Sequence, residues 1–171
     1  REICIQYAEK FPDKIRLFLR DRSISLVLTE NYAFRSLNGY FSRSAARGKY
    51  IAMCEGDDYW IDVHKLQYQY DILESNDEFV LCSHDFIIYD YKDKVFKEQP
   101  LHEKLKYLPQ EIIYTFYNDI GWLWKTLTIM YRNYAYPVNI ELRYKYWEDT
   151  HLIYHILKKG NGIFINQIMG V

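Results

Sequence analysis

The sequence predicts an α/β fold with helices on both sides of a central sheet. Two apolar runs, over residues 50–54 and 79–89, are short and bounded by polar or turn residues, which is typical of buried strands. Other segments repeat apolar residues at the three- and four-residue spacing of amphipathic helices. A chain of 171 residues is long enough for one domain with its own core, so we treat residues 1–171 as a single domain.

The first third of the chain is predicted to contain two helices. Ile3, Tyr7 and Phe11 recur at helical spacing, and Pro12 ends that pattern. The later helix has an apolar face made of Phe34, Leu37, Phe41 and Ala45. The expected series is helix, strand, loop and helix, over residues 3–11, 15–19, 20–25 and 30–47.

Two arginines of the second predicted helix are candidates for anion binding. A guanidinium group matches the geometry of a phosphate, so Arg35 and Arg43 could contact a nucleotide diphosphate. The alternative is that both side chains are solvated on the outer face of the helix.

Three carboxylates follow the strand predicted over residues 50–54. This run is typical of a strand in the middle of a sheet that is covered on both faces. Ligands of open α/β sheets bind outside the carboxyl ends of strands, and Gly56 allows the chain to turn there. Glu55, Asp57 and Asp58 would form an oxygen-rich site suited to Mg²⁺ or Mn²⁺. A solvated acidic turn is the alternative.

The rest of the chain is predicted to alternate between helices and strands around one charged surface excursion. The excursion covers residues 90–109. Helices are expected up to residue 75 and over residues 103–108, 111–117 and 149–160. Strands are expected over residues 79–89 and 162–169.

A polar triplet interrupts the strand predicted over residues 79–89. Ser83, His84 and Asp85 follow one another where the pattern is otherwise apolar. A polar group inside a buried strand costs free energy unless it is paired. The triplet therefore either faces a cleft or is hydrogen-bonded within the core.

Aromatic residues form a further group of candidates for ligand contact. Tyr59 and Trp60 follow the acidic turn directly, where a purely solvated turn would not need them. Trp122 and Trp124 precede the apolar run over residues 127–132. Tryptophan stacks well on sugar rings, but packing in the core is the alternative for the second pair.

A second acidic pair begins an amphipathic helix near the end of the chain. Glu148 and Asp149 follow Trp147, and Gly160 ends the helix after two lysines. A structural interpretation exists for Asp149, because aspartate is a favoured N-cap residue worth roughly 0.5–2 kcal/mol. A cap would also hold the carboxylate in place for chemistry.

Composition excludes several classes of function. The net charge of −1 argues against a nucleic-acid partner. Cys4, Cys54 and Cys82 are widely spaced, so we expect reduced, buried thiols and no structural zinc site. No apolar run approaches the ~20 residues of a membrane span, and no signal-peptide pattern is present. We expect a cytoplasmic location, with the inner face of the membrane as an alternative position.

The string EGDDYW at residues 55–60 resembles the acidic D-x-D-D motif of family 2 glycosyltransferases, with Glu55 where that motif has its first Asp. The preceding RGKYI, at residues 47–51, and the following KLQ, at residues 65–67, resemble the flanks of that motif. Residues 127–132 resemble a strand of the family that lines its acceptor cleft. The resemblance implies a GT-A, Rossmann-like fold, a mixed sheet flanked by helices. It also implies a piece truncated at both ends, lacking the N-terminal strand that binds the donor base.

The same resemblance implies a metal-assisted, inverting sugar transfer. Asp57 and Asp58 would hold Mg²⁺ or Mn²⁺, with Glu55 in the same loop. The pair at residues 148–149 resembles the family's "ED" position, which makes Asp149 the catalytic base and Glu148 a weaker candidate. The implied partners are a nucleotide sugar, most commonly UDP-linked, and a carbohydrate or lipid-linked acceptor. The candidates for the acceptor cleft are Tyr59, Trp60, His84, Asp85, Trp122, Trp124 and Trp147.

Two other classes of function remain open from the sequence. One is a different metal-dependent phosphoryl or nucleotidyl transferase that uses the same carboxylates, although the chain has no Gly-rich Walker loop. The other is a non-catalytic carbohydrate-binding or interaction module of the same fold, because Glu55 replaces the usual Asp.

Overall fold

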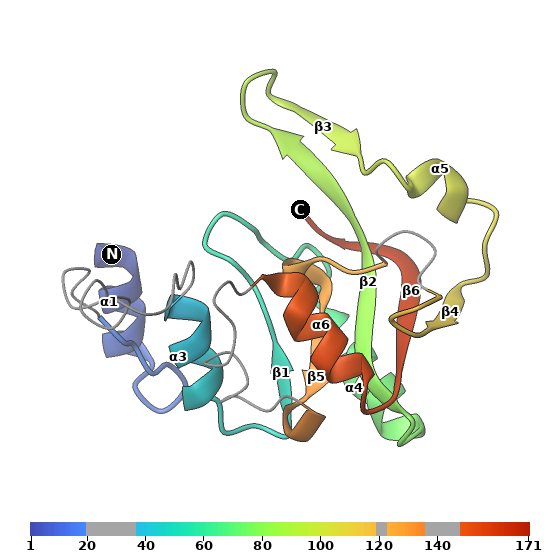
Figure 1. Ribbon diagram of the computed structural model, residues 1–171. Helices are drawn as coiled ribbons and strands as arrows, with labels where there is room; N and C mark the ends of the chain where they lie inside the picture. The colour runs from blue at the N-terminus through green and yellow to red at the C-terminus, as the bar shows by residue number, and fades with distance from the viewer. Residues whose placement is uncertain (20–36, 119–122, 136–147) are drawn as a thin grey trace.

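The computed structural model describes residues 1–19, 37–118, 123–135 and 148–171, and shows a mixed α/β fold (Figure 1). A six-stranded mixed sheet has the order β1-β5-β2-β6-β4, with β3 paired to β2 as a hairpin. The strands are β1 (Tyr50–Ala52), β2 (Phe79–Asp90), β3 (Val95–Glu98), β4 (Glu111–Tyr114), β5 (Met130–Arg132) and β6 (Asn161–Gly170).

The centre of the sheet is the parallel pair β2 and β6. In β2, the residues from Phe79 to Asp85 are all buried, which explains the nearly unbroken apolar run of that segment. On its other side β2 pairs antiparallel with β5, and β5 pairs antiparallel with β1. This arrangement confirms the strands predicted over residues 79–89 and 162–169.

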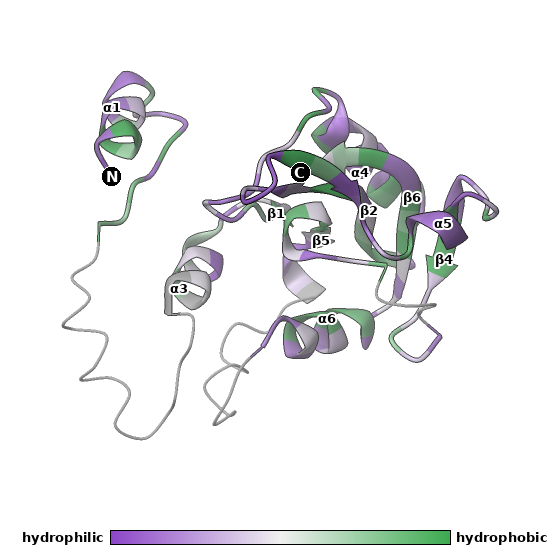
Figure 2. Ribbon diagram, turned by 90° about the horizontal axis from the view of Figure 1, so that it is seen from above, coloured by the Kyte–Doolittle hydropathy of each residue, from purple (hydrophilic) through white to green (hydrophobic). Residues whose placement is uncertain are grey.

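Helices α4 (Lys65–Ser75) and α6 (Asp149–Leu157) lie on opposite faces of the sheet (Figure 2). Leu152, Ile153 and Ile156 of α6 belong to one apolar cluster with Val80 and Phe164. On the other face, a second cluster consists of Leu73, Phe79, Cys82, Met130, Ile163, Ile165 and Met169. The apolar stripes predicted for these two helices therefore build one core layer each.

The structure differs from the predicted elements at three places. Residues 15–19 form no strand, and Leu17, Phe18 and Leu19 are exposed. Residues 111–117 were expected to be helical, but Glu111–Tyr114 is strand β4, because its backbone pairs with β6 along four residues. Strand β1 is shorter than expected and pairs only with β5 among the described strands. It therefore lies at the end of that sheet rather than in its middle.

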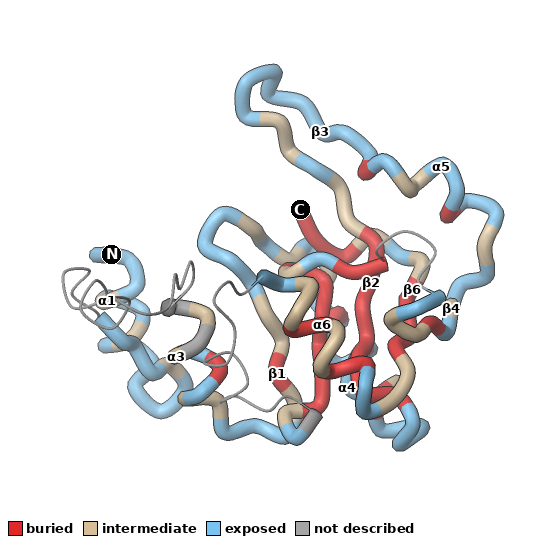
Figure 3. The backbone as a smooth tube through the Cα atoms, viewed as in Figure 1, coloured by how far each residue is buried: buried red, intermediate tan, exposed pale blue. Residues whose placement is uncertain are grey.

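Four further elements complete the described chain. Helix α1 (Glu2–Lys10) has no buried residue and lies apart from the layers around the sheet (Figure 1). Helix α3 (Leu37–Ala45) is the described part of the helix predicted over residues 30–47, whose earlier portion lies outside the described residues. The charged excursion is confirmed as the exposed β2–β3 hairpin followed by the short helix α5 (His102–Leu105) (Figure 3).

The structure bears on the expectation of buried cysteine thiols and on the expectation that no segment spans a membrane. Cys82 is buried, and its burial raises the pKa of the thiol to about 12, whereas Cys4 and Cys54 are exposed. The expectation of buried thiols is therefore correct only for Cys82. In the described part of the chain, every helix is too short or too polar to cross a membrane.

Candidate functional site

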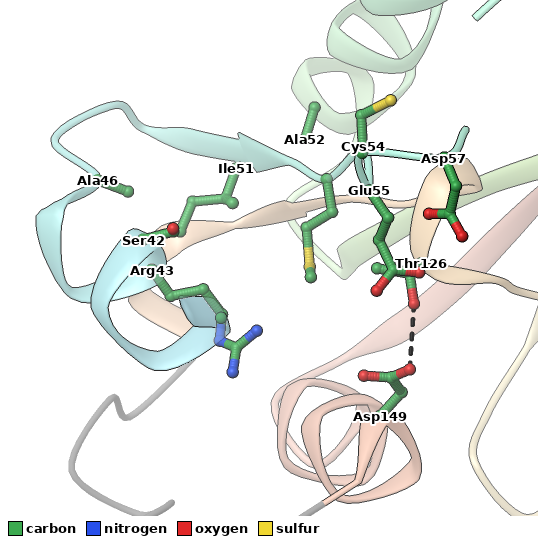
Figure 4. Close-up of a pocket in the computed structure, with 13 residues that line it drawn as sticks. Ser42, Arg43, Ala46, Ile51, Ala52, Cys54, Glu55, Asp57, Thr126 and Asp149 are labelled. Carbon is green, nitrogen blue, oxygen red and sulfur yellow. Dashed lines mark hydrogen bonds between the residues drawn. The ribbon is translucent and has the colours of Figure 1, made fainter. Parts of the chain in front are cut away.

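A cavity of about 590 Å³ lies where α3, the loop after β1 and the N-terminus of α6 meet. Its wall combines apolar and charged side chains from parts of the chain that are distant in sequence (Figure 4). The charged residues that line it are Arg43, Glu55, Asp57 and Asp149. The structure thus brings the two predicted acidic segments together at one cavity.

The first acidic segment is a tight turn after β1. The N–H of Asp58 donates a hydrogen bond to the Glu55 carbonyl over 3.3 Å, which closes the turn. Glu55 and Asp57 line the cavity, whereas Asp58 is absent from its lining. Gly56 needs no left-handed backbone here, and a Cβ on it would contact nothing within 4 Å. The predicted steric reason for this glycine is therefore wrong.

The second acidic segment is the start of α6. Asp149 is the first residue of the helix, and Glu148 occupies the N-cap position. The N-cap interpretation of Asp149 is therefore wrong. Its carboxylate instead accepts a hydrogen bond of 3.1 Å from the Thr126 hydroxyl and faces the Glu55 side chain across the cavity (Figure 4). The position at the helix N-terminus favours its negative charge.

Negative charge is concentrated at this end of the cavity. Burial raises the pKa of Glu55, and the charges of Asp149, Asp58 and Asp57 raise it further. Burial and the adjacent Asp57 also raise the pKa of Asp58. Carboxylates that disfavour one another's ionisation in this way would be stabilised by a bound cation.

Arg43 supplies the opposite charge. It lies on α3, lines the cavity and is only 6% exposed, so the alternative of a solvated helix arginine is wrong for this residue. Arg35 lies outside the described residues. A buried guanidinium opposite a group of carboxylates could hold a ligand that is itself anionic and is bridged to the carboxylates by a cation.

Of the aromatic candidates, the three that the structure describes, Tyr59, Trp60 and Trp124, do not line the cavity. Trp124 is buried in the core with 7% exposure, and Tyr59 is exposed beside the acidic turn. Trp60 donates its indole N–H to the Leu127 carbonyl over 2.9 Å, which fixes it against the protein. Trp122 and Trp147 lie outside the described residues.

The polar triplet of β2 lies in the core, away from the cavity. The Asp85 carboxylate, 1% exposed, accepts hydrogen bonds from Gln99 over 2.9 Å and from His102 over 2.7 Å. The Nδ1–H of His84 donates to the Asp85 carbonyl over 2.7 Å, and burial lowers the pKa of His84 to about 4. The interpretation of a hydrogen-bonded triplet within the core is confirmed.

Several residues that line the cavity were not predicted as site residues, and two of them lie next to its acidic groups. Thr126 hydrogen-bonds Asp149, and Met53 extends the apolar wall next to the acidic turn. A threonine in the 3-10 helix η1 (Thr126–Thr128) carries no local signal of this role. The role of Thr126 is visible only in the folded chain, where its hydroxyl donates to the Asp149 carboxylate.

The donor set at the cavity fits a hard divalent cation in part. In the residues that the structure describes, no three His, Cys, Asp or Glu side chains are arranged to hold a metal together. Mg²⁺ is commonly bound through one or two carboxylates together with substrate phosphates and water. Glu55 and Asp57 at the cavity, with Asp58 beside them, match that kind of site.

Comparison with known proteins found no family model that matches the chain. Part of it is similar to uncharacterized proteins of Mycobacterium bovis and of two strains of Mycobacterium tuberculosis, CDC 1551 and H37Rv. Each is 36% identical over 97 residues, which cover 56% of this chain. The match spans 25% of the length of each relative.

Proposed function

We propose that the protein is an inverting glycosyltransferase with a GT-A fold that works in the cytoplasm. It would move a sugar from a nucleotide diphosphate to an acceptor hydroxyl with the help of a divalent metal. The main support is the cavity, because carboxylates from two distant segments face one another there beside a buried arginine. The mixed sheet flanked by helices is compatible with that fold class.

The acidic turn and Arg43 would bind the donor. Asp57 and Asp58, with Glu55 beside them, would hold Mg²⁺ or Mn²⁺, and the Arg43 guanidinium would contact the diphosphate from the other wall. When bound, the metal neutralises charge on the diphosphate leaving group. The donor is a nucleotide sugar, and UDP-linked sugars are the first to test.

Asp149 would act as the catalytic base. The acceptor is a carbohydrate or lipid-linked hydroxyl, whose oxygen forms a bond to the anomeric carbon while the bond from that carbon to the diphosphate breaks. The hydroxyl proton passes to the Asp149 carboxylate. Thr126 holds this carboxylate toward the cavity through its 3.1 Å hydrogen bond, which keeps the base oriented.

A panel of nucleotide sugars tests this function in the full-length chain. We expect metal-dependent hydrolysis of one donor, loss of that hydrolysis in Asp57→Asn, and no turnover of nucleoside triphosphates. Asp93→Asn is the matched control, because Asp93 is an exposed aspartate of the β2–β3 hairpin. Turnover of triphosphates would favour a phosphoryl or nucleotidyl transferase, and binding without any hydrolysis would favour a binding module.

A further inference from the structure

The acidic turn is anchored on its C-terminal side by the end of β6. Tyr59 and Val171 exchange two backbone hydrogen bonds of 3.0 and 2.9 Å, and the Ile61 N–H donates to the Met169 carbonyl over 3.0 Å. Between Tyr59 and Ile61, Trp60 forms an isolated antiparallel β-bridge with Gly170. The chain that follows the carboxylates is therefore attached to the buried end of β6 through backbone hydrogen bonds, and side-chain contacts can add to its rigidity.

The Trp60 side chain connects this segment to the other side of the cavity. Its indole N–H donates to the carbonyl of Leu127, which belongs to η1. The residue before it, Thr126, holds the Asp149 carboxylate. One indole ring thus links the segment that carries Glu55 and Asp57 to η1, which contains the Thr126 that hydrogen-bonds Asp149.

Lys65 lies directly over the Trp60 ring. It is the first residue of α4, is 1% exposed, and its Nζ is 4.0 Å from the ring centroid. In the described part of the chain this Nζ has no hydrogen-bond partner. Burying an ammonium group without a hydrogen bond is unfavourable, and the face of an aromatic ring compensates only in part. Folding alone therefore gives no reason for a lysine here.

We infer that Lys65 and Trp60 form a clamp, a buried cation on an indole ring, that holds the acidic turn in place at the cavity. Both are positioning residues, and Trp60 serves the site from behind the turn rather than as a surface for a sugar ring. The inference depends on the proposed function in one respect only, which is that the acidic turn binds a metal and a diphosphate.

Among the described residues, Cys54, Cys82 and His84 are titratable groups that interact electrostatically with Lys65. Burial lowers the pKa of Lys65 to about 8 and is the largest influence on it. The pKa values of the thiols of Cys82, from β2, and Cys54, from the loop after β1, are themselves raised by burial. His84 of β2 interacts with Lys65 electrostatically and is neutral at pH 7. The clamp is therefore cationic at neutral pH.

Hydrogen exchange of backbone amides tests the clamp without any ligand. In Lys65→Met, which keeps the shape of the side chain, we expect the amides of Tyr59, Ile61 and Val171 to exchange at least about tenfold faster than in the wild type. The amides of β2 should be unchanged, and the melting temperature should not fall, because an uncompensated buried charge has been removed. Lys158→Met is the control, since Lys158 is an exposed lysine 5.5 Å from the Tyr154 ring.

Trp60→Phe provides a second variant if Lys65→Met does not fold. It keeps a ring beneath Lys65 but removes the hydrogen bond to Leu127, and the same three amides should exchange faster. Unchanged exchange at these amides, or equal acceleration in β2, would overturn the clamp. Failure of the proposed function would appear separately, as a wild-type protein with a protected turn that binds no metal or nucleotide.

Discussion

The position of the Asp149 side chain distinguishes this residue from its neighbour Glu148. The Asp149 carboxylate is hydrogen-bonded to Thr126 and Asp149 lines the cavity, whereas Glu148 is the N-cap of α6 and is not among the described residues that line the cavity. Asp149 is therefore the better candidate for chemistry.

For Asp149→Asn we expect normal donor binding and a loss of transfer by about 10²–10⁴-fold, because the amide cannot accept the acceptor proton. The Asn oxygen can still accept the Thr126 hydrogen bond. Only the favourable charge at the start of α6 is lost, worth roughly 0.3–1 kcal/mol, so the melting temperature should change little. Donor affinity, melting temperature and transfer rate should be measured on one preparation, with Glu148→Gln as the control. Near-normal transfer would remove Asp149 as the base.

His84 makes a second prediction at the scale of a single residue. Its pKa is lowered from 6.5 to about 4 in the folded protein, so the unfolded chain binds more protons between these values. His84 therefore contributes stability above pH 6.5 that is lost as the pH falls toward 4, at roughly 1.4 kcal/mol per pH unit at most. In His84→Gln the unfolding free energy should depend less on pH in this window. Parallel pH profiles for the two proteins, from urea titrations, would contradict the assignment.

At the scale of elements, Arg132 joins strand β5 to its surroundings. It is buried and donates to the Phe79 carbonyl over 2.8 Å, to the Tyr50 hydroxyl over 3.0 Å and to the Leu73 carbonyl. One side chain thereby connects β5 with the start of β2, with β1 and with the end of α4. Because β1 carries the acidic turn, this junction also supports the cavity.

Arg132→Met should destabilise the fold, because it leaves buried carbonyl groups without donors at a cost of roughly 1–3 kcal/mol each. We expect a lower urea midpoint with an unchanged dependence on urea concentration. Arg47→Met, at an exposed arginine before β1, is the control and should leave the midpoint unchanged. Equal midpoints for Arg132→Met and the wild type would show that the junction contributes nothing.

The sequence was enough to predict those strands and helices whose own residues show the apolar spacing of a strand or a helix. The buried strands and the amphipathic helices α4 and α6 carry their periodicity in the sequence. Strand β4 was missed because its state depends on pairing with β6, a partner far along the chain. The position of β1 at the end of the described strands depends in the same way on which strands join it.

At the scale of the whole molecule, the candidate site is assembled from segments that are distant in sequence. The acidic turn and Asp149 each had a local signal, and the fold brings them to one cavity. The burial of Arg43, the hydrogen bond from Thr126 and the place of Trp60 behind the turn depend on the packing of α3, η1 and α4. No pattern within one segment predicts such contacts.

Titration calorimetry of UDP and UDP-sugars tests the central claim that this cavity binds a nucleotide diphosphate through a metal. With the full-length chain in Mn²⁺ or Mg²⁺, we expect binding that weakens by at least about tenfold, or 1.4 kcal/mol, on chelation of the metal. Asp57→Asn should lower the affinity in the presence of metal by a similar factor, and Asp93→Asn should not. Equal affinity with and without the metal would contradict the assignment of the acidic turn.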